Sequence, residues 1–202
     1  MARPRQQDTK QLLDAATQLF WRQGYAATGT REIELALGLK SPAIYHRFHS
    51  KHGLFCASLR HYIESVIDWR IRHYLDAEDA LTGLYAFFES IPQNAKRFQQ
   101  PSSCLLVNTS LERASADEEI QACLHEGTHK ILLALRSNLL RLQAQHLLAP
   151  NAKIDQLADN LQLQLFGLLV SSRLNNEHHC LADKARHIIA TLPITATTGA
   201  NE

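Results

Sequence analysis

The chain has 202 residues, of which 45% are apolar and 20% charged, a balance that is typical of a globular protein and excludes a disordered one. Its longest apolar run, residues 165–170, is far shorter than the roughly 20 residues that a membrane-spanning helix needs. The basic N-terminus has no apolar stretch behind it, so we expect no secretory signal and a soluble, cytoplasmic protein.

The net charge of +1 hides an uneven distribution along the chain. Residues 1–55 carry eight Lys or Arg and four Asp or Glu, a net of +4, whereas the remainder carries 13 and 16, a net of −3. Three histidines, His46, His49 and His52, lie at the end of the basic segment. A positive head on a negative body suits binding to phosphate, but the excess is small and by itself favours this only slightly.

Helical periodicity runs through the whole sequence, and no alternating apolar run is bounded by turn residues. We therefore expect an all-α protein of about nine or ten helices. The first carries an apolar stripe over residues 12–20 and stops at Gly24. A short helix over 30–37 stops at Gly38, and a second short helix has Ser41 as its N-cap and runs to about Phe48. Ser50 is expected to cap a longer fourth helix.

The rest of the chain is predicted to be helical between proline breaks. Segments near 77–90 and 102–113 are separated by Pro92 and Pro101. Acids at 117–119 suit the start of a long helix that reaches about residue 145. An apolar helix over 154–175 follows, and a last short helix ends before Pro193.

Residues 28–54 form the most informative stretch, because two short helices joined by a glycine-containing turn outline a helix-turn-helix. Ile33, Leu37, Ile44 and Phe48 have the spacing of buried anchors. Such a unit also occurs as mere packing in helical proteins, and that alternative stays open on the pattern alone. Side chains on the outward face, on the turn and at the neighbouring helix starts are the candidate DNA contacts: Thr28, Thr30, Arg31, Lys40, Ser41, Pro42, Ala43, Tyr45, His46, Arg47 and Lys51.

The same stretch resembles the DNA-binding domain of the TetR family of bacterial regulators over residues 8–56. The resemblance rests on an LxxxAxxLFxxxGY lead-in at 12–25, the TREI sequence at 30–33, Gly38, the segment 42–48, the Ser-Lys step at 50–51 and Leu54. It implies a three-helix DNA-binding domain followed by a helical bundle that binds a ligand and forms the dimer. We expect these domains to occupy residues 1–50 and 51–195.

Three positions depart from the family pattern. Glu34 stands where a small residue usually packs between helices, so a buried carboxylate is in question there. Lys40 replaces the common Ser or Thr before the recognition helix, and His52 replaces a usual Glu. These differences make the operator sequence unpredictable.

The helices at 117–145 and 154–175 are apolar on more than one side, so each needs more than one packing partner. We infer that they also pack across a two-fold axis in a homodimer, an arrangement that the resemblance implies as well. The operator would then be a palindrome, read by two recognition helices about 34 Å apart.

A ligand pocket is expected between the fourth helix and the body helices, suited to a small hydrophobic or aromatic effector. Aromatic residues at helical spacing equally fit an ordinary core. The candidate lining residues are Tyr62, Val66, Trp69, Tyr85, Phe88, Cys104, Asn108, Leu111, Phe166 and Arg173, with Gln164 as a further polar group.

The four cysteines, Cys56, Cys104, Cys123 and Cys180, form no C-x-x-C pair and no zinc pattern, so we expect reduced thiols, no metal and no cofactor. Cys104 is a candidate sensor of oxidants, although the sequence around it contains no cation that would make the thiol more reactive. His125 and His129 have metal-compatible spacing but no local third ligand. The run His178–Cys180 fits a loop end better than a metal site.

Two other classes of protein compete with a regulator. An enzyme would usually show a glycine-rich phosphate loop, a G-x-S-x-G elbow or an H-E-x-x-H pair, and the sequence contains none of them. An architectural DNA-binding protein would carry more positive charge than +1. We therefore predict a repressor that binds a palindromic operator as a homodimer and is released by a small molecule. The alternative is an effector-independent or redox-sensing DNA-binding protein that uses Cys104.

Overall fold

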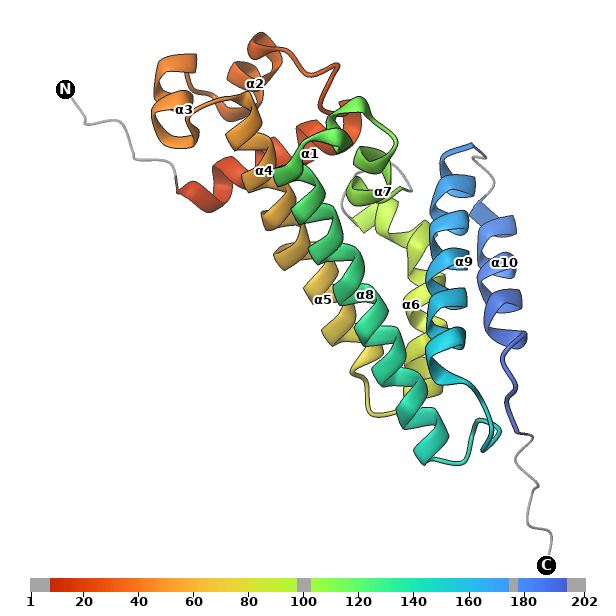
Figure 1. The fold of residues 1–202 in the computed structure, drawn as a ribbon. Helices are drawn as coiled ribbons and strands as arrows, with labels where there is room; N and C mark the ends of the chain where they lie inside the picture. Colours follow the sequence, from red (N-terminus) through yellow and green to blue (C-terminus); the bar gives the residue numbers. More distant parts are fainter. Residues whose placement is uncertain (1–7, 98–102, 175–177, 196–202) are drawn as a thin grey trace, which may run out of the picture. The chain divides into compact units, whose positions relative to one another are not determined.

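The computed structural model describes residues 8–97, 103–174 and 178–195 (Figure 1). Within those ranges the secondary structure is helical, and the only β pairing is an isolated bridge between Leu148 and Ile194. This confirms the predicted all-α fold. None of the described helices has the length and hydropathy to cross a membrane. The α-helices are α1 (Thr9–Gln23), α2 (Thr30–Leu37), α3 (Ser41–Phe48), α4 (Lys51–Tyr62), α5 (Asp68–Arg70), α6 (Ala80–Arg97), α7 (Leu105–Ser110), α8 (Glu118–Ala144), α9 (Ile154–Leu174) and α10 (His178–Ala190).

The chain divides into two compact units. The first comprises residues 1–66 and 104–127, and the second comprises residues 67–103 and 128–202. The first unit therefore contains the whole predicted helix-turn-helix together with α4, α7 and the first part of α8.

The boundaries of the first helices follow local signals in the sequence. Gly24 ends α1 with φ 81°, and its N–H donates to the carbonyl of Phe20 at 2.8 Å. Gly38 ends α2 in the left-handed region at φ 63°, where a side chain would be strained. Ser50 caps α4, its hydroxyl accepting from the N–H of Gly53 at 3.0 Å. All three predicted boundaries are confirmed.

An aromatic cluster fills the core of the first unit where α1 packs on α4. Phe20 and Phe55 meet edge to face with ring centroids 4.9 Å apart, and Tyr25 lies 4.7 Å from Phe55. Trp21 meets Tyr62 in the same geometry at 4.9 Å. Such pairs add about 0.5–1.5 kcal/mol each beyond the burial of their area. The helix that supports the predicted helix-turn-helix is thereby held rigidly against α1.

The fourth helix is interrupted by two π-helical turns, at Ile63–Ile67 and Ile71–Leu75, which the sequence did not reveal. The prediction that Pro92 ends a helix was wrong, because α6 continues to Arg97. Leu84, Phe87, Phe88 and Ile91 continue the buried apolar face of α6 up to this proline, so tertiary packing outweighs the local breaker. Pro101 lies outside the described residues.

The segment predicted as one helix over 102–113 is shorter than expected: α7 spans Leu105–Ser110, and a 3₁₀ turn follows at Arg113–Ala116. The long helix at 117–145 is confirmed as α8. The carboxylate of Asp117 accepts from the N–H groups of Glu119 and Ile120 at 3.0 and 3.1 Å and so caps the helix. The helices at 154–175 and before Pro193 are confirmed as α9 and α10.

In the second unit, α8 holds the turn that precedes α6. The fully buried Asn138 donates its amide to the carbonyls of Leu75 and Ala80, both at 3.1 Å. Arg141 also donates to Leu75, at 3.0 Å, and to the next carbonyls of the same turn. These bonds from α8 give side-chain donors to the backbone carbonyls of the turn, two of them in buried bonds.

Candidate nucleic-acid interface

The helix-turn-helix is built on four buried side chains that fix the two short helices to the unit. Ile33 and Leu37 of α2 and Ile44 and Phe48 of α3 are all at most 8% exposed. Their spacing puts one face of each helix into the core and leaves the opposite face of α3 in solvent. The predicted anchors are thus confirmed, and the N-terminal turn of α3 is presented outward.

The predicted DNA-contact residues lie mainly on that outward surface. Thr28 differs, since it is 1% exposed and its hydroxyl donates to the carbonyl of Gly24 at 2.6 Å. Thr30 and Tyr45 bring the two helices together, with their hydroxyls 3.5 Å apart. Ser41, Tyr45 and Lys51 are half-buried, and the remaining members are exposed: Thr30, Arg31, Lys40, Pro42, Ala43, His46 and Arg47.

The start of α3 is capped by a residue of α2 rather than by Ser41, which corrects the prediction for Ser41. The helix begins at Ser41, and the carboxylate of Glu34 accepts from its N–H at 2.8 Å and from its hydroxyl at 2.7 Å. The ammonium of Lys40 donates to the same carboxylate at 3.2 Å. The two hydrogen bonds from Ser41 are the main reason that the pKa of Glu34 is lowered to about 2, and the bond from Lys40 adds to the effect. A carboxylate at a position that usually holds a small residue therefore ties the two helices of the motif together.

Lys51 and Tyr25 meet beside the motif. The Lys51 ammonium lies 4.5 Å from the centre of the Tyr25 ring, a cation–π contact at the first turn of α4. Burial lowers the pKa of Lys51, and the nearby Glu112 opposes that change. Burial also raises the pKa of Tyr25. Both side chains thus have structural partners besides the DNA contact predicted for Lys51.

Glu112 is a positioning residue that the sequence did not reveal. Its two carboxylate oxygens accept from the backbone N–H groups of Tyr25 and Ala26 at 3.2 and 3.1 Å. These donors lie in the turn between α1 and α2, so a residue from after α7 fixes where α2 begins. Nothing in the local sequence around Tyr25 or Glu112 signals this pairing.

The predicted ligand-lining residues fall in both units. In the first unit Tyr62, Val66, Cys104 and Asn108 are buried, and the Tyr62 hydroxyl donates to the Cys104 sulfur at 3.4 Å. Leu111 belongs to the same unit but is 73% exposed.

In the second unit Phe88 is buried, while Trp69, Tyr85 and Phe166 are half-buried; the side chain of Arg173 is outside the description. A separate groove of about 570 Å³ between α9 and α10 has Gln164 among its lining residues, with Leu168 and Ile188.

Comparison with known proteins places these features in a family. Residues 12–57 match the family model described as bacterial regulatory proteins, tetR family. The chain is 27% identical over 172 residues to the HTH-type transcriptional repressor ComR of Escherichia coli strain K12, which covers 85% of this chain and 82% of that protein. It is 30% identical over 100 residues, 48% of this chain and 46% of the relative, to the HTH-type transcriptional activator FasR of Mycolicibacterium smegmatis.

Solved structures of TetR-family regulators also superpose on this chain. A cysteine mutant of the TetR family regulator CifR, in complex with 26-bp operator DNA, superposes with a TM-score of 0.84 at 25% identity, covering 95% of this chain and all of that one. The reduced form of Escherichia coli NemR gives a TM-score of 0.81 at 20% identity, covering 94% and 99%.

Residues 12–57 thus match the DNA-binding part of the TetR family, and the chain as a whole is similar to TetR-family proteins, which are DNA-binding transcriptional regulators rather than enzymes. The resemblance seen in the sequence is thereby confirmed, and the enzyme alternative is set aside.

Proposed function

We propose that this protein is a repressor that binds a palindromic operator as a homodimer and leaves it when a small effector binds. The observation that carries the DNA-reading step is the outward N-terminal face of α3, held by Glu34 and backed by the buried Ile44 and Phe48. In a helix-turn-helix this face enters the major groove, while residues at neighbouring helix starts bind phosphate.

On this proposal Arg47 and Tyr45 contact the DNA from α3, and Arg31, Lys40 and Lys51 supply charge around them. Residues 1–50 act as the DNA-binding domain and residues 51–195 as the sensing and dimerisation domain, working in the cytoplasm. Occupancy of a promoter would most simply block polymerase, which favours repression. The relatives include both a repressor and an activator, so they do not decide this point.

Two exposed apolar stripes support the homodimer. On α8, Leu133 and Leu140 are 50% and 40% exposed, and on α9, Leu163 and Val170 are 68% and 38% exposed. Each pair is seven residues apart and so lies on one helix face. Soluble proteins bury such stripes against a partner, and a two-fold interface through α8 and α9 would do so.

A matched pair of substitutions tests the interface. Leu163→Glu should convert dimers to monomers in sedimentation experiments, because it puts a charge in the proposed contact. Leu111→Glu changes a side chain of similar exposure, 73%, in the first unit and should leave the dimer intact. Equal sedimentation of both variants and the wild type would remove α9 from the interface.

The effector step is a shift of population. A small hydrophobic or aromatic molecule bound among the predicted lining residues would release DNA only to the extent that it prefers the conformation unable to bind the operator. In the first unit, the buried side chain of Tyr62 beside Cys104 is the aromatic candidate for that contact.

Redox sensing through Cys104 is the second candidate. Cys104 is 4% exposed and its sulfur accepts from the Tyr62 hydroxyl, which places an oxidisable group against one of the proposed lining residues. Peroxide treatment of the wild type and of Cys104→Ser distinguishes the two: redox control predicts operator release in the wild type only.

The DNA-reading step is tested by selecting bound sequences from a random DNA pool. The wild type should enrich a palindrome, Arg47→Ala and Tyr45→Ala should lose it, and Arg72→Ala, an exposed change in the second unit, should keep it. Enrichment that survives both α3 substitutions would refute the proposed interface.

A further inference from the structure

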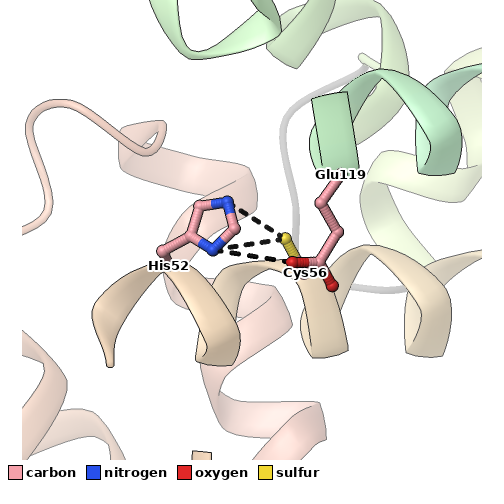
Figure 2. Close-up of side chains that lie close together, drawn as sticks. All are labelled: His52, Cys56 and Glu119. Carbon is pink, nitrogen blue, oxygen red and sulfur yellow. Dashed lines mark hydrogen bonds and ion pairs between the residues drawn. The ribbon is translucent and has the colours of Figure 1, made fainter. Parts of the chain in front are cut away.

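Three potential metal ligands of different chemistry converge where the first turn of α4 meets the start of α8 (Figure 2). His52 and Cys56 lie one turn apart on α4, and Glu119 lies in the first turn of α8. One nitrogen of His52, the sulfur of Cys56 and one oxygen of Glu119 all lie within 4.8 Å of one another. All three belong to the first unit.

Two of the three ligand-atom separations are close to those of tetrahedral coordination, and the third, between the Cys56 sulfur and the Glu119 oxygen, is at most 4.8 Å. Bond lengths of about 2.0–2.3 Å around zinc require neighbouring ligand atoms to be roughly 3.4–3.6 Å apart. The Nδ1 atom of His52 lies 4.0 Å from the sulfur of Cys56 and 3.7 Å from the Oε2 atom of Glu119. Both separations exceed the required values by a few tenths of an ångström, a change that small side-chain rotations provide.

The second ring nitrogen of His52 is held in the manner typical of metal-binding histidines. Its Nε2 atom lies 2.9 Å from the carboxylate of Asp117, and this pairing lowers the pKa of Asp117. A carboxylate that accepts from one nitrogen directs the lone pair of the other nitrogen toward a metal and raises its basicity. Asp117 is itself fixed, since it caps α8.

We propose that His52, Cys56 and Glu119 form a site for a divalent transition metal of the zinc class, with Asp117 as the positioning residue for His52. Nitrogen, sulfur and carboxylate oxygen are the donors that zinc takes, and solvent completes the fourth position. Cys56 is fully buried, so its sulfur forms the inner end of the site. The side chains of His52 and Glu119 are 33% and 47% exposed, so a metal ion can enter from solvent on their side.

Binding requires the thiol to lose its proton. Burial, with Glu119 and Cys123 nearby, raises the pKa of Cys56 to about 12, so the thiol is protonated in the metal-free protein. The cation takes the place of that proton, which passes to solvent as the metal–sulfur bond forms. Glu119 also accepts from Arg60 at 2.7 Å through its other oxygen, which leaves Oε2 for the metal.

The position of the site suggests what metal binding does. Only two residues separate the end of α3 from the start of α4, so the first turn of α4 directly follows the proposed recognition helix. A metal that bonds this turn to α8 would fix the base of α3 and change operator affinity. This regulatory step rests on the proposed function, whereas the metal site itself does not.

Cobalt titration of the chelator-treated full chain tests the site without DNA. The wild type should bind one Co²⁺ per chain and show a thiolate-to-cobalt charge-transfer band with the strong visible bands of tetrahedral coordination. Cys56→Ser and Cys56→Ala should abolish the charge-transfer band, whereas Cys104→Ser, which alters another buried cysteine of the same unit, should keep it. Absence of the band in the wild type, or its survival in both Cys56 variants, would overturn the proposal.

Substitution of the buried Cys56 can disturb folding, so the site is also tested by substitutions at two exposed positions. Glu119→Gln removes a ligand, and Asp117→Asn retains an acceptor for the helix cap but loses the carboxylate charge beside His52. Zinc affinity, measured by competition with a chromophoric chelator, should fall at least about 10-fold in both. His125→Gln, an exposed change further along α8, should have wild-type affinity. Unchanged affinity in Glu119→Gln and Asp117→Asn would contradict the assigned ligand set.

The regulatory step has its own readout, the affinity for the selected operator with and without zinc. We expect a change of at least about 5-fold in the wild type, the lower end of ordinary allosteric coupling, and none in Cys56→Ala. Operator binding that zinc leaves unchanged would remove the regulatory step and retain both the metal site and the repressor. Failure to bind any operator with metal-free or zinc-loaded protein would refute the proposed function instead.

Discussion

Lys40 offers the sharpest quantitative test of phosphate contact. Its side chain is 86% exposed and directly precedes α3, where it pairs with Glu34 at 3.2 Å. An exposed pair of this kind contributes little to stability, so Lys40→Gln should leave the fold intact. The lysine can exchange that carboxylate for a DNA phosphate when the operator binds.

The size of the effect follows from counterion release. Each phosphate that a protein neutralises adds about 0.9 to the slope of log affinity against log salt, so removing one lysine from each protomer of a dimer lowers the slope by about 1.8. Between 50 and 200 mM salt, Lys40→Gln should therefore lose about 10-fold less affinity than the wild type loses.

Fluorescence anisotropy of a labelled operator over a series of salt concentrations measures both slopes. Lys153→Gln makes the same charge change at an exposed position in the second unit and should reproduce the wild-type slope. Parallel slopes for wild type and Lys40→Gln would refute the phosphate contact. A reduced slope in Lys153→Gln as well would show that only net charge matters.

Three further predictions concern stability. Glu34 has a pKa of about 2 in the folded protein, below its ordinary 4.5, so the stability that its carboxylate contributes is present above pH 4.5 and is lost as the pH falls toward 2. The Tm of the wild type should therefore fall more between pH 5 and 2 than the Tm of Glu34→Gln. Parallel Tm curves for the two proteins would contradict this. Asn138→Asp replaces the donor to two buried carbonyls and should cost about 2–4 kcal/mol in denaturant unfolding, a loss under 1 kcal/mol arguing against those bonds. Gly38→Ala places a side chain at φ 63° and should cost about 1 kcal/mol, whereas an unchanged midpoint would mean that the turn relaxes.

The sequence predicted the helix boundaries well wherever the signal is local. Gly24, Ser50 and Asp117 act through bonds within a few residues of themselves, and Gly38 acts through its own left-handed backbone, so their roles can be read from the chain. Pro92 is the exception, because the apolar face around it is buried by contacts that the local sequence does not contain.

Contacts between distant segments could not be predicted in this way. Ser41 has the right character for a cap, and only the fold shows that Glu34 takes this role. Glu112 and Tyr25 are 87 residues apart. The His52 and Cys56 spacing is readable as a possible ligand pair, but Glu119 joins them only after α4 and α8 have packed. The helix-turn-helix could be predicted because its pattern lies in one continuous stretch of the sequence.

The measurement that tests the central claim most directly compares the affinity for a selected operator with that for a scrambled duplex of equal length at one salt concentration. For the wild type we expect a ratio of at least about 1,000, the lower end for specific DNA-binding proteins. Arg47→Ala and Tyr45→Ala should reduce this ratio far more than they weaken binding to the scrambled duplex. A wild-type ratio near one, or a high ratio that survives both substitutions, would contradict the assignment of α3 as the element that reads DNA.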